Sequence, residues 1–409
     1  MTTACGDVSG YDAARRGAGG RLDRWAALGL ALLLTLLAAA PAVEAKTRRV
    51  APSRPAAAPP ISATTPAWIV INAASGEELF RQEPDRPGAP ASMTKMMLAL
   101  LTLEAMRDGQ LRLSDSVRAS RLASKMGGSQ VYLKEGEEFP AEEMMAALLI
   151  GSANDAAAAL AERLTGSVEA TVRRMNERAA ALRLTQTRFG SVHGLPPAPG
   201  QQGDVTTPRD MARLGQELLK FPDVLRWTGT IEAPFRGGAF ILRNSNKLVG
   251  SVAGVDGLKT GHFREAGYNV AATAKRGSLR LIAVVMGAPT NQARFAEATR
   301  LLGEGFATYV EVPVAKAGAP VGGEIRIARS RIPFKPVAAG DLTVHVRREA
   351  REQVKTSLEM QSDLRAPLKS GQPVGALVVR LGEREIARTA AVTPFEIKRW
   401  PLWWLTPWK

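Results

Sequence analysis

The sequence predicts a mixed α/β (α+β) domain, in which helices flank an antiparallel sheet, followed by a small all-β sandwich domain. Length is the first observation, because 409 residues exceed what one typical hydrophobic core accommodates. The second is that helical and strand patterns are mixed between residues 66 and 310. The third is that short alternating apolar runs, separated by Gly, Pro and Asp turns, occupy residues 311–396.

The first 45 residues have the pattern of a secretory signal peptide. Several arginines precede an apolar run that ends near Ala40, and residues 43–45 offer small side chains for cleavage. Since that run is shorter than the ~20 residues of a membrane-spanning helix, an uncleaved anchor is the second interpretation. The only cysteine, Cys5, lies in this segment, so no disulfide is expected in the mature chain. Residues 46–65 are rich in Pro, Ala and Arg, which predicts a linker.

The first domain is expected to open with two strands, 67–72 and 78–81, joined by a turn. The segment from Ser92 to Met106 is apolar on almost every side, which predicts a helix buried at the centre of the domain. Residues 114–138 are polar and rich in turn formers. Further helices are predicted over 141–149, 156–164, 167–182 and from Pro208 onward, with Thr207 as the N-cap.

Strand patterns return in the second half of this domain. Residues 255–261 are followed by runs at 268–274 and 279–286, and Gly277-Ser278 indicates a hairpin between the last two. The amphipathic pattern of residues 294–309 predicts a helix that packs against this sheet. In the sandwich, strands are expected at 324–327, 342–346 and 376–379.

The tail, residues 397–409, contains four of the seven tryptophans. Tryptophans together with basic residues predict an interfacial membrane anchor. The tail is too short, and too interrupted by Pro401 and Pro407, to form a spanning helix. The alternative is that the tryptophans pack on the sandwich. The net charge of +15 suits an anionic membrane surface or polymer. Nucleic acid is not expected as a partner, because the folded part has no basic run interleaved with aromatic residues.

The first candidate catalytic motif is Ser92-Met93-Thr94-Lys95, in which a serine and a lysine are three residues apart. On a helix, Ser92 and Lys95 lie on one face, one turn apart, so Lys95 is the nearest base for the Ser92 hydroxyl. Burial among Met and Leu lowers the pKa of a lysine, and a neutral lysine can accept the proton of a nucleophilic serine. Because Ser-x-x-Lys is a common spacing, the plain alternative is a helix start with a solvated lysine.

Two further motifs follow in order, Ser152-Ala153-Asn154 and Lys259-Thr260-Gly261. Together with the first they match the serine acyl-transferase motifs of penicillin-binding proteins and β-lactamases, with Ser-Ala-Asn in place of Ser-Asp-Asn. The surrounding sequence resembles the low-molecular-mass penicillin-binding proteins that are D-alanyl-D-alanine carboxypeptidases, serine peptidase family S11. The resemblance covers roughly residues 67–397 and includes the segments 127–129, 193–196, 207–210, 256–262, 266–269 and 366–375.

The resemblance implies a penicillin-binding, transpeptidase-like fold and a role for each motif residue. Ser92 would attack the carbonyl between two terminal D-alanines and form an acyl-enzyme ester, with Lys95 as the general base. Ser152 would pass the proton to the leaving amine, and Asn154 would hold the substrate amide. Water would then release the shortened peptide. No metal or other cofactor is expected.

The third motif is implied to bind substrate. Lys259 and Thr260 would bind the terminal carboxylate, and Gly261 and His262 would complete that wall. The backbone N–H groups of Ser92 and His262 would form the oxyanion hole. The implied partners are peptidoglycan stem peptides ending in D-Ala-D-Ala and β-lactam antibiotics as inhibitors. The implied location is periplasmic, peripheral on the outer face of the inner membrane, with a role in cell-wall remodelling.

Two departures from the family pattern and three alternatives stay open. Phe263 stands where the family often has a hydroxyl residue, and residues 244–247 stand where some members have an arginine, so no arginine is assigned to substrate. A β-lactamase is the first alternative, although the chain lacks the Leu-Asn dipeptide and β-lactamases lack the sandwich. A D-Ala endopeptidase of the same superfamily and an inactive wall-binding scaffold are the others.

Overall fold

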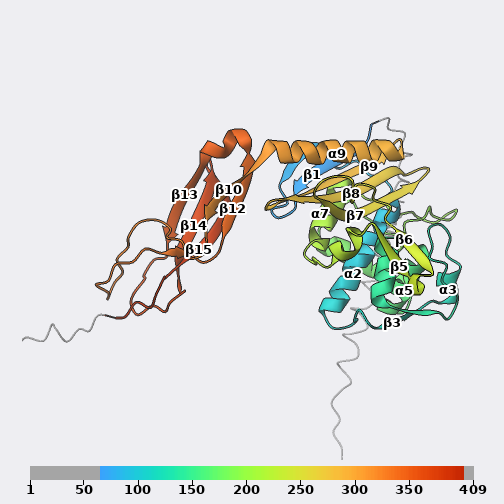
Figure 1. The fold of residues 1–409 in the computed structure, drawn as a ribbon, viewed down its shortest axis with the longest axis horizontal. Coiled ribbons are helices and arrows are strands. Elements are labelled where there is room, and N and C mark those ends of the chain that lie inside the picture. Colours follow the sequence, from blue (N-terminus) through green and yellow to red (C-terminus); the bar gives the residue numbers. More distant parts are fainter. Residues whose placement is uncertain (1–64, 400–409) are drawn as a thin grey trace, which may run out of the picture. The chain divides into compact units, whose positions relative to one another are not determined.

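The computed structural model describes residues 65–399 (Figure 1). The predicted signal peptide, almost all of the predicted linker and the tail from residue 400 lie outside the described residues. Within residues 65–399, no helix is both long enough and apolar enough to cross a bilayer.

The first domain is built on a five-stranded antiparallel sheet in the order β2-β1-β9-β8-β7. Chain neighbours β8 and β9 form the predicted hairpin, and Gly277 turns with a φ of 59° between them. The amino-terminal strands pair with β9, which closes the sheet across more than 180 residues of sequence. The strands are β1 (Ala67–Asn72), β2 (Glu78–Gln82), β7 (Val255–Phe263), β8 (Gly267–Arg276) and β9 (Leu279–Ala288).

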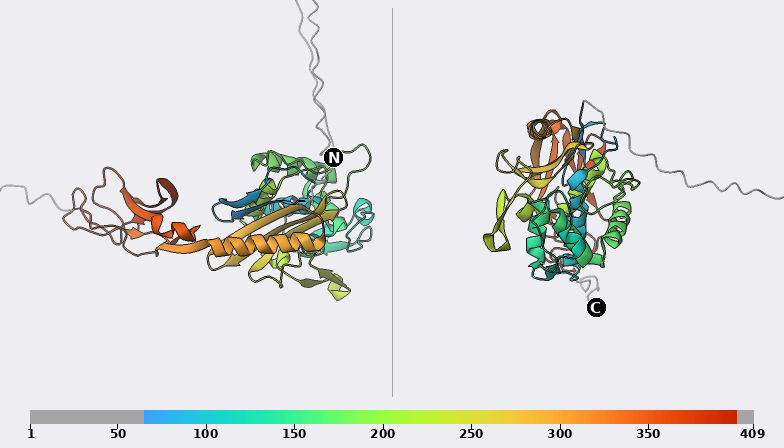
Figure 2. Two further views of the ribbon diagram at one scale, coloured as in Figure 1. Left: turned by 90° about the horizontal axis from the view of Figure 1, so that it is seen from above. Right: turned by 90° about the vertical axis from the view of Figure 1, so that its right-hand side faces the viewer.

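Each face of the sheet has its own hydrophobic core, because strand side chains alternate between the two faces. Ile69 and Val284 belong to a large core shared with α2 (Lys95–Arg107) and α7 (Pro208–Leu218). Val70 and Val285, one residue further along, belong to a second core. That second core is covered by α9 (Asn291–Thr308), which lies on the opposite face of the sheet (Figure 2).

The predicted central helix is preceded by a 3-10 turn, η1 (Ala91–Thr94), and is buried along almost its whole length. It packs against α5, whose run of buried alanines, Ala156 to Ala159, allows close approach of the neighbouring helices. Thr207 caps α7 as predicted, since its hydroxyl accepts from the Asp210 N–H. The remaining elements are β3 (Ser116–Arg118), α3 (Arg121–Ser124), β4 (Glu138–Pro140), α4 (Ala141–Leu149), α5 (Asn154–Thr165), α6 (Val168–Ala181), α8 (Val224–Thr228), β5 (Glu232–Phe235), η2 (Arg236–Gly238) and β6 (Phe240–Arg243).

The second domain is all-β, as predicted, apart from one 3-10 turn. A two-stranded sheet pairs β10 with β12, and a four-stranded sheet has the order β11-β15-β14-β13. Val346 and Val379 from the two sheets meet in one core, so the sheets pack as a small sandwich. The elements are β10 (Tyr309–Ala315), β11 (Val337–Ala338), β12 (Leu342–Arg347), η3 (Arg348–Gln353), β13 (Val354–Met360), β14 (Pro373–Leu381) and β15 (Arg384–Val392).

Two predicted elements are wrong in detail. The helix predicted to end at Tyr309 ends at Thr308, because Tyr309 is extended and begins β10, where it pairs with Arg347. Residues 324–327 do not form a strand, since only Ile325 exchanges backbone hydrogen bonds, with Phe334. A single bridge is too short to continue the sheet.

Candidate active site

Ser92 lies in the turn η1, where the chain enters α2. Pro90 precedes the turn and Ala91 has a φ of 50°, so the backbone bends sharply before the helix begins. Ser92 is partly exposed, whereas Lys95 at the first position of α2 is completely buried. The two side chains lie on one face, with Lys95 Nζ 3.0 Å from Ser92 Oγ. The structure therefore brings the pair together as the helical spacing predicts.

Three oxygen atoms surround the Lys95 nitrogen. Besides Ser92 Oγ, Nζ is 2.7 Å from Asn154 Oδ1 and 2.7 Å from the backbone carbonyl of His193. A neutral amine has two hydrogens and one lone pair. Asn154 Oδ1 and the His193 carbonyl can only accept hydrogen bonds, so they take the two hydrogens of the amine. The lone pair then faces the Ser92 hydroxyl. This geometry suits Lys95 as the acceptor of the serine proton.

The electrostatic surroundings favour the neutral form of Lys95. Burial holds the pKa of Lys95 well below its usual range, and the positive charge of Lys259 lowers this pKa further. The negative charges of Asp204 and Asp155 act in the opposite direction with smaller effect. The solvated lysine considered as the alternative from sequence is thus not what the fold contains.

Ser152 and Asn154 lie at the junction between α4 and α5, from which Asn154 reaches Lys95. Ser152 has an unusual φ of 59°, and its hydroxyl makes no hydrogen bond with any residue from 65 to 399. Asn154 accepts from Lys95 and donates through Nδ2 to the Gly127 carbonyl at 2.7 Å. Asn154 therefore orients the lysine, and this contact was not predicted from the sequence. One hydrogen of the Asn154 amide stays available for substrate.

Lys259 and Thr260 lie on β7, which forms a third side of the site. Lys259 is almost fully buried, and its Nζ donates only to the Thr260 carbonyl among described residues, at 3.2 Å. Burial, followed by the charge of Arg294, lowers the pKa of Lys259 to about 7. The Thr260 hydroxyl is hydrogen-bonded to Ser245 Oγ at 2.7 Å. Ser245 is therefore a neighbour of the site that the sequence motifs did not reveal.

Arg294 lies behind β7 and was also missed from sequence. It projects from α9, where its guanidinium donates to the carbonyls of Gly261 at 3.1 Å and Asn269 at 2.9 Å. These bonds tie the third motif to the neighbouring strand β8 and hold a fixed positive charge near Lys259. In the sequence, Arg294 belongs only to an amphipathic helix pattern, and no motif spacing connects it with Lys259.

The backbone of β7 approaches the Ser92 turn so closely that Gly261 has no room for a side chain. A Cβ at Gly261 would lie 2.3 Å from the Pro90 carbonyl oxygen and 3.0 Å from Ser92 N. The next residue, His262, stacks its ring on Tyr268 with ring centres 3.8 Å apart. The His262 side chain is therefore engaged with β8, while its backbone follows directly after the point of closest approach to Ser92.

A loop between α6 and α7 closes the site from the side of Lys95. Gly194 has a φ of 80°, and a Cβ there would lie 2.0 Å from the Ala91 carbonyl oxygen, so this loop presses on the turn η1. The preceding His193 supplies the backbone carbonyl to Lys95. Burial, with a smaller contribution from Lys95, lowers the pKa of the His193 imidazole to about 4. Sequence reasoning noted this segment only as part of the resemblance.

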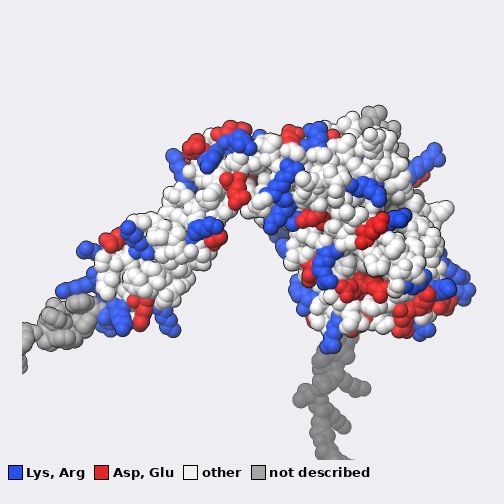
Figure 3. Space-filling view, in the orientation of Figure 1, with Lys and Arg blue, Asp and Glu red and all other residues white. Residues whose placement is uncertain are grey.

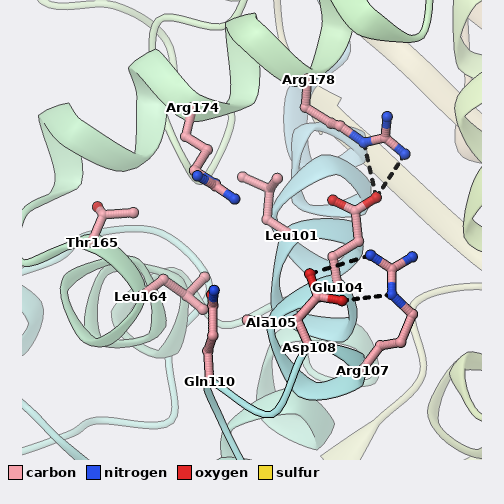
Figure 4. A pocket seen from close by; sticks show the side chains of 10 residues that line it. All are labelled: Leu101, Glu104, Ala105, Arg107, Asp108, Gln110, Leu164, Thr165, Arg174 and Arg178. Carbon is pink, nitrogen blue, oxygen red and sulfur yellow. Dashed lines mark hydrogen bonds and ion pairs between the residues drawn. The ribbon is translucent and has the colours of Figure 1, made fainter.

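A separate cavity of about 360 Å³ lies at the other end of α2, roughly 18 Å along the helix axis from Lys95 (Figure 4). Among its lining residues, Arg178 binds Glu104 and Arg107 binds Asp108. The residues that line this cavity include none of the motif residues Ser92, Lys95, Ser152, Asn154, Lys259 and Thr260.

Two family models match most of the described chain. The sequence model for the D-alanyl-D-alanine carboxypeptidase family, peptidase S11, matches residues 53–290. The model for the C-terminal domain of penicillin-binding protein 5 matches residues 309–399. D-alanyl-D-alanine carboxypeptidase DacF of Bacillus subtilis is 35% identical over 336 residues, 81% of this chain and 85% of the relative. DacA of Escherichia coli is 32% identical over 385 residues, 92% of this chain and 93% of the relative.

Solved structures show the same fold. Penicillin-binding protein 5 from Haemophilus influenzae aligns with a TM-score of 0.66 at 30% identity, covering 82% of this chain and 98% of that one. PBP3 from Streptococcus pneumoniae, described as a peptidoglycan synthesis regulatory factor, aligns with a TM-score of 0.73 at 23% identity, covering 82% and 99%. The arrangement of a mixed helix-and-sheet domain followed by an all-β domain is thus shared with penicillin-binding proteins.

Proposed function

Because the chain belongs to the D-alanyl-D-alanine carboxypeptidase family of serine peptidases, S11, we propose that it removes the terminal D-alanine of peptidoglycan pentapeptides through an acyl-enzyme on Ser92. One observation carries this proposal. The nitrogen of the buried Lys95 lies 3.0 Å from Ser92 Oγ while Asn154 and His193 occupy its other two directions. A serine beside a fixed base whose pKa is lowered by burial is the arrangement that nucleophilic catalysis requires.

Acylation begins with transfer of the Ser92 proton to Lys95. The serine oxygen attacks the carbonyl carbon of the penultimate D-alanine and forms a tetrahedral oxyanion. The close approach of β7 at Gly261 supports an oxyanion hole made by the backbone N–H groups of Ser92 and His262.

The carbon–nitrogen bond then breaks, and the leaving amine must gain a proton. We assign the transfer of that proton from Lys95 to Ser152, which lies two residues before the Lys95-bound Asn154 and whose hydroxyl has no competing hydrogen-bond partner among the described residues. Water, deprotonated by the same base, attacks the ester and releases the shortened peptide, so that Ser92 and Lys95 return to their starting states.

The third motif accounts for an exopeptidase specificity. A terminal carboxylate needs a positive charge and hydroxyl donors, and Lys259 and Thr260 on β7 offer both. Substrate carboxylate would favour the protonated form of Lys259, whose pKa of about 7 in the empty site leaves it poised between both forms.

β-Lactams present a strained amide and a carboxylate at similar spacing, so we propose that they acylate Ser92 as well. Penicillin-binding protein D2 of Listeria monocytogenes, 34% identical over 59% of this chain, is described in an ampicillin-bound form. Trimming of stem peptides would give the protein a part in cell-wall biogenesis and remodelling. Of the alternatives, a β-lactamase or an endopeptidase is disfavoured by the match of residues 309–399 to a penicillin-binding protein 5 domain.

Labelled penicillin tests the nucleophile. The mature protein is incubated with it, digested and analysed by mass spectrometry, and the expected result is a covalent label on Ser92. A Ser92→Ala variant with an unchanged melting temperature is the control and should carry no label. Label on another serine, or none while a reference carboxypeptidase reacts, would exclude this mechanism and favour the inactive scaffold.

We further propose that the protein is exported to the periplasm and touches the outer face of the inner membrane peripherally, through its tail. Three segments of the second domain share one small core, and all their charged residues are exposed. Residues 324–335, 361–372 and 393–399 together contain eight Lys or Arg and three Asp or Glu. This basic end is visible in Figure 3, and its last segment, residues 393–399, leads into the Trp-rich stretch. Both features suit an anionic lipid surface.

Deletion of residues 398–409 tests the location. The truncated protein should leave the membrane fraction while its activity on a soluble peptide stays unchanged, since the motif residues lie far upstream in the first domain. If both forms fractionate alike, sequencing the mature amino terminus decides whether an uncleaved signal segment is the anchor instead.

A further inference from the structure

Asp204 is a carboxylate near the site to which none of the motifs points. It precedes α7 and accepts four hydrogen bonds. Oδ1 accepts from the backbone N–H groups of Gly190 at 2.6 Å and Ser191 at 2.9 Å. Oδ2 accepts from the hydroxyls of Thr94 at 2.7 Å and Ser191 at 2.9 Å.

These four donors come from two segments that both touch Lys95. Thr94 is the residue directly before Lys95 in the first motif and is completely buried. Ser191 in turn accepts the Gly194 N–H at 2.8 Å, which shapes the loop that offers the His193 carbonyl to Lys95. One carboxylate therefore joins the start of α2 to the loop that fixes one of the lysine's hydrogens.

We propose that Asp204 is a positioning residue for acylation, whose carboxylate holds the Ser92–Lys95 turn and the 190–194 loop together so that the His193 carbonyl stays on Lys95 Nζ. This inference rests on the proposed acyl-enzyme chemistry. Without the carboxylate, Lys95 Nζ alone would link the loop to the turn by a side-chain hydrogen bond within residues 65–399, and the lone pair of Lys95 is no longer held toward Ser92.

The carboxylate also contributes charge. The charged groups that act on Lys95 are Lys259, which lowers its pKa, and Asp204 and Asp155, which raise it. The neighbouring imidazole of His193 has its own pKa lowered by burial and by Lys95. Removing the charge of Asp204 therefore lowers the pKa of Lys95 and moves the acid limb of the acylation rate to lower pH. Loss of a purely structural contact would slow acylation without moving that limb.

Asp204→Asn is the test variant, because it keeps the shape and leaves an oxygen for the N–H groups of Gly190 and Ser191. The second-order rate of acylation by a chromogenic or labelled β-lactam is measured against pH. Hydrogen bonds to a charged group contribute more than neutral ones, so we expect acylation to slow about tenfold or more, with the acid limb shifted to lower pH. A rate within about twofold of wild type and an unmoved limb would overturn the proposal.

Asp210→Asn is the matched control. Asp210 lies six residues away and also accepts from a backbone N–H, that of Gln186 at 3.0 Å, and from a hydroxyl, that of Thr187 at 2.8 Å. It does not contact the Ser92–Lys95 turn. This variant should lose thermal stability while keeping its acylation profile. Equal kinetic changes in both variants would mean that Asp204 acts only through general stability.

Thr94→Val gives an independent route if Asp204→Asn folds poorly. It removes one donor, the Thr94 hydroxyl, and keeps the side-chain shape. We expect slower acylation in the single variant and no further loss when it is combined with Asp204→Asn, because the two changes break the same link. Fully additive losses, or none in Thr94→Val, would contradict the proposal. Absence of label on wild-type Ser92 would instead overturn the proposed function, and so the two failures are distinguishable.

Discussion

Lys259 provides the sharpest test of how the site recognises substrate. Its pKa is about 7, lowered by burial and then by Arg294, so about half of the free enzyme holds a charged Lys259 at pH 7. At pH 8, about one molecule in eleven holds a charged Lys259. If the charge binds the terminal carboxylate, kcat/KM for a D-Ala-D-Ala peptide should fall about fivefold between pH 7 and pH 8.

Two substitutions at this position separate charge from structure. Lys259→Ala removes the charge, and a charge-assisted hydrogen bond of about 1.5–3 kcal/mol corresponds to a loss of about 10- to 150-fold in kcat/KM. Lys259→Arg keeps the charge at every accessible pH, so the fall between pH 7 and pH 8 should disappear in that variant.

The assay compares a peptide with a free terminal carboxylate and a matched ester that lacks it, from pH 6 to pH 9. The ester should show neither the fivefold fall nor the large loss in Lys259→Ala. Equal losses on both substrates would refute carboxylate recognition and assign Lys259 to proton transfer or to packing. A fall that persists in Lys259→Arg would show that another group titrates in this range.

Three other variants test the remaining parts of the site. Lys95→Ala should slow acylation by about 10²–10⁴-fold, as expected for loss of a general base, and a rate near wild type would place the base elsewhere. On folding, the pKa of His193 falls from 6.5 to about 4, so the unfolded chain binds more protons than the folded chain between these pH values. The free energy of unfolding should therefore decline by up to about 3 kcal/mol as the pH drops through this range. His193→Asn, in denaturant titrations at pH 7 and pH 4, should lack this decline, and an unchanged decline would point to other groups. Gly261→Ala should slow acylation at least about 100-fold, because its Cβ would lie 2.3 Å from the Pro90 carbonyl oxygen. The control is Gly303→Ala on α9, which has open space and should be neutral or slightly stabilising. Matching behaviour of the two variants would refute the close approach of β7 to the Ser92 turn.

Local patterns in the sequence were sufficient for the elements that carry the motifs. The apolar stretch after Ser92 predicted a buried helix, and the helical spacing placed Ser92 and Lys95 on one face, since periodicity and short spacing act within a few residues. The capping of α7 by Thr207 and the hairpin at Gly277 were also correct, because both depend on neighbouring residues alone. The end of the helix at Thr308 was misplaced by one residue, because Tyr309 is recruited by pairing with the distant strand β12.

The surroundings of Lys95 could not be predicted in the same way. The His193 carbonyl lies 98 residues away in sequence and is a backbone atom, so no residue type identifies it. Asp204, which binds Thr94 across 110 residues, looks in sequence like an ordinary turn residue before a helix. Ser245 and Arg294 likewise reach the third motif only through tertiary packing, since Arg294 projects from α9, which packs on β8 and β9.

The sequence by itself determined the type of chemistry, because a serine one helical turn from a lysine, followed by Ser-x-Asn and Lys-Thr-Gly, restricts the residue types to those of a serine acyl-transferase. Only the tertiary structure decided the state of those residues. The pKa of Lys95 depends on burial and on the charges of Lys259 and Asp204, and that of Lys259 depends on burial and Arg294. Both are set by long-range packing, since desolvation and Coulomb interactions depend on distances in space and not on separation along the chain.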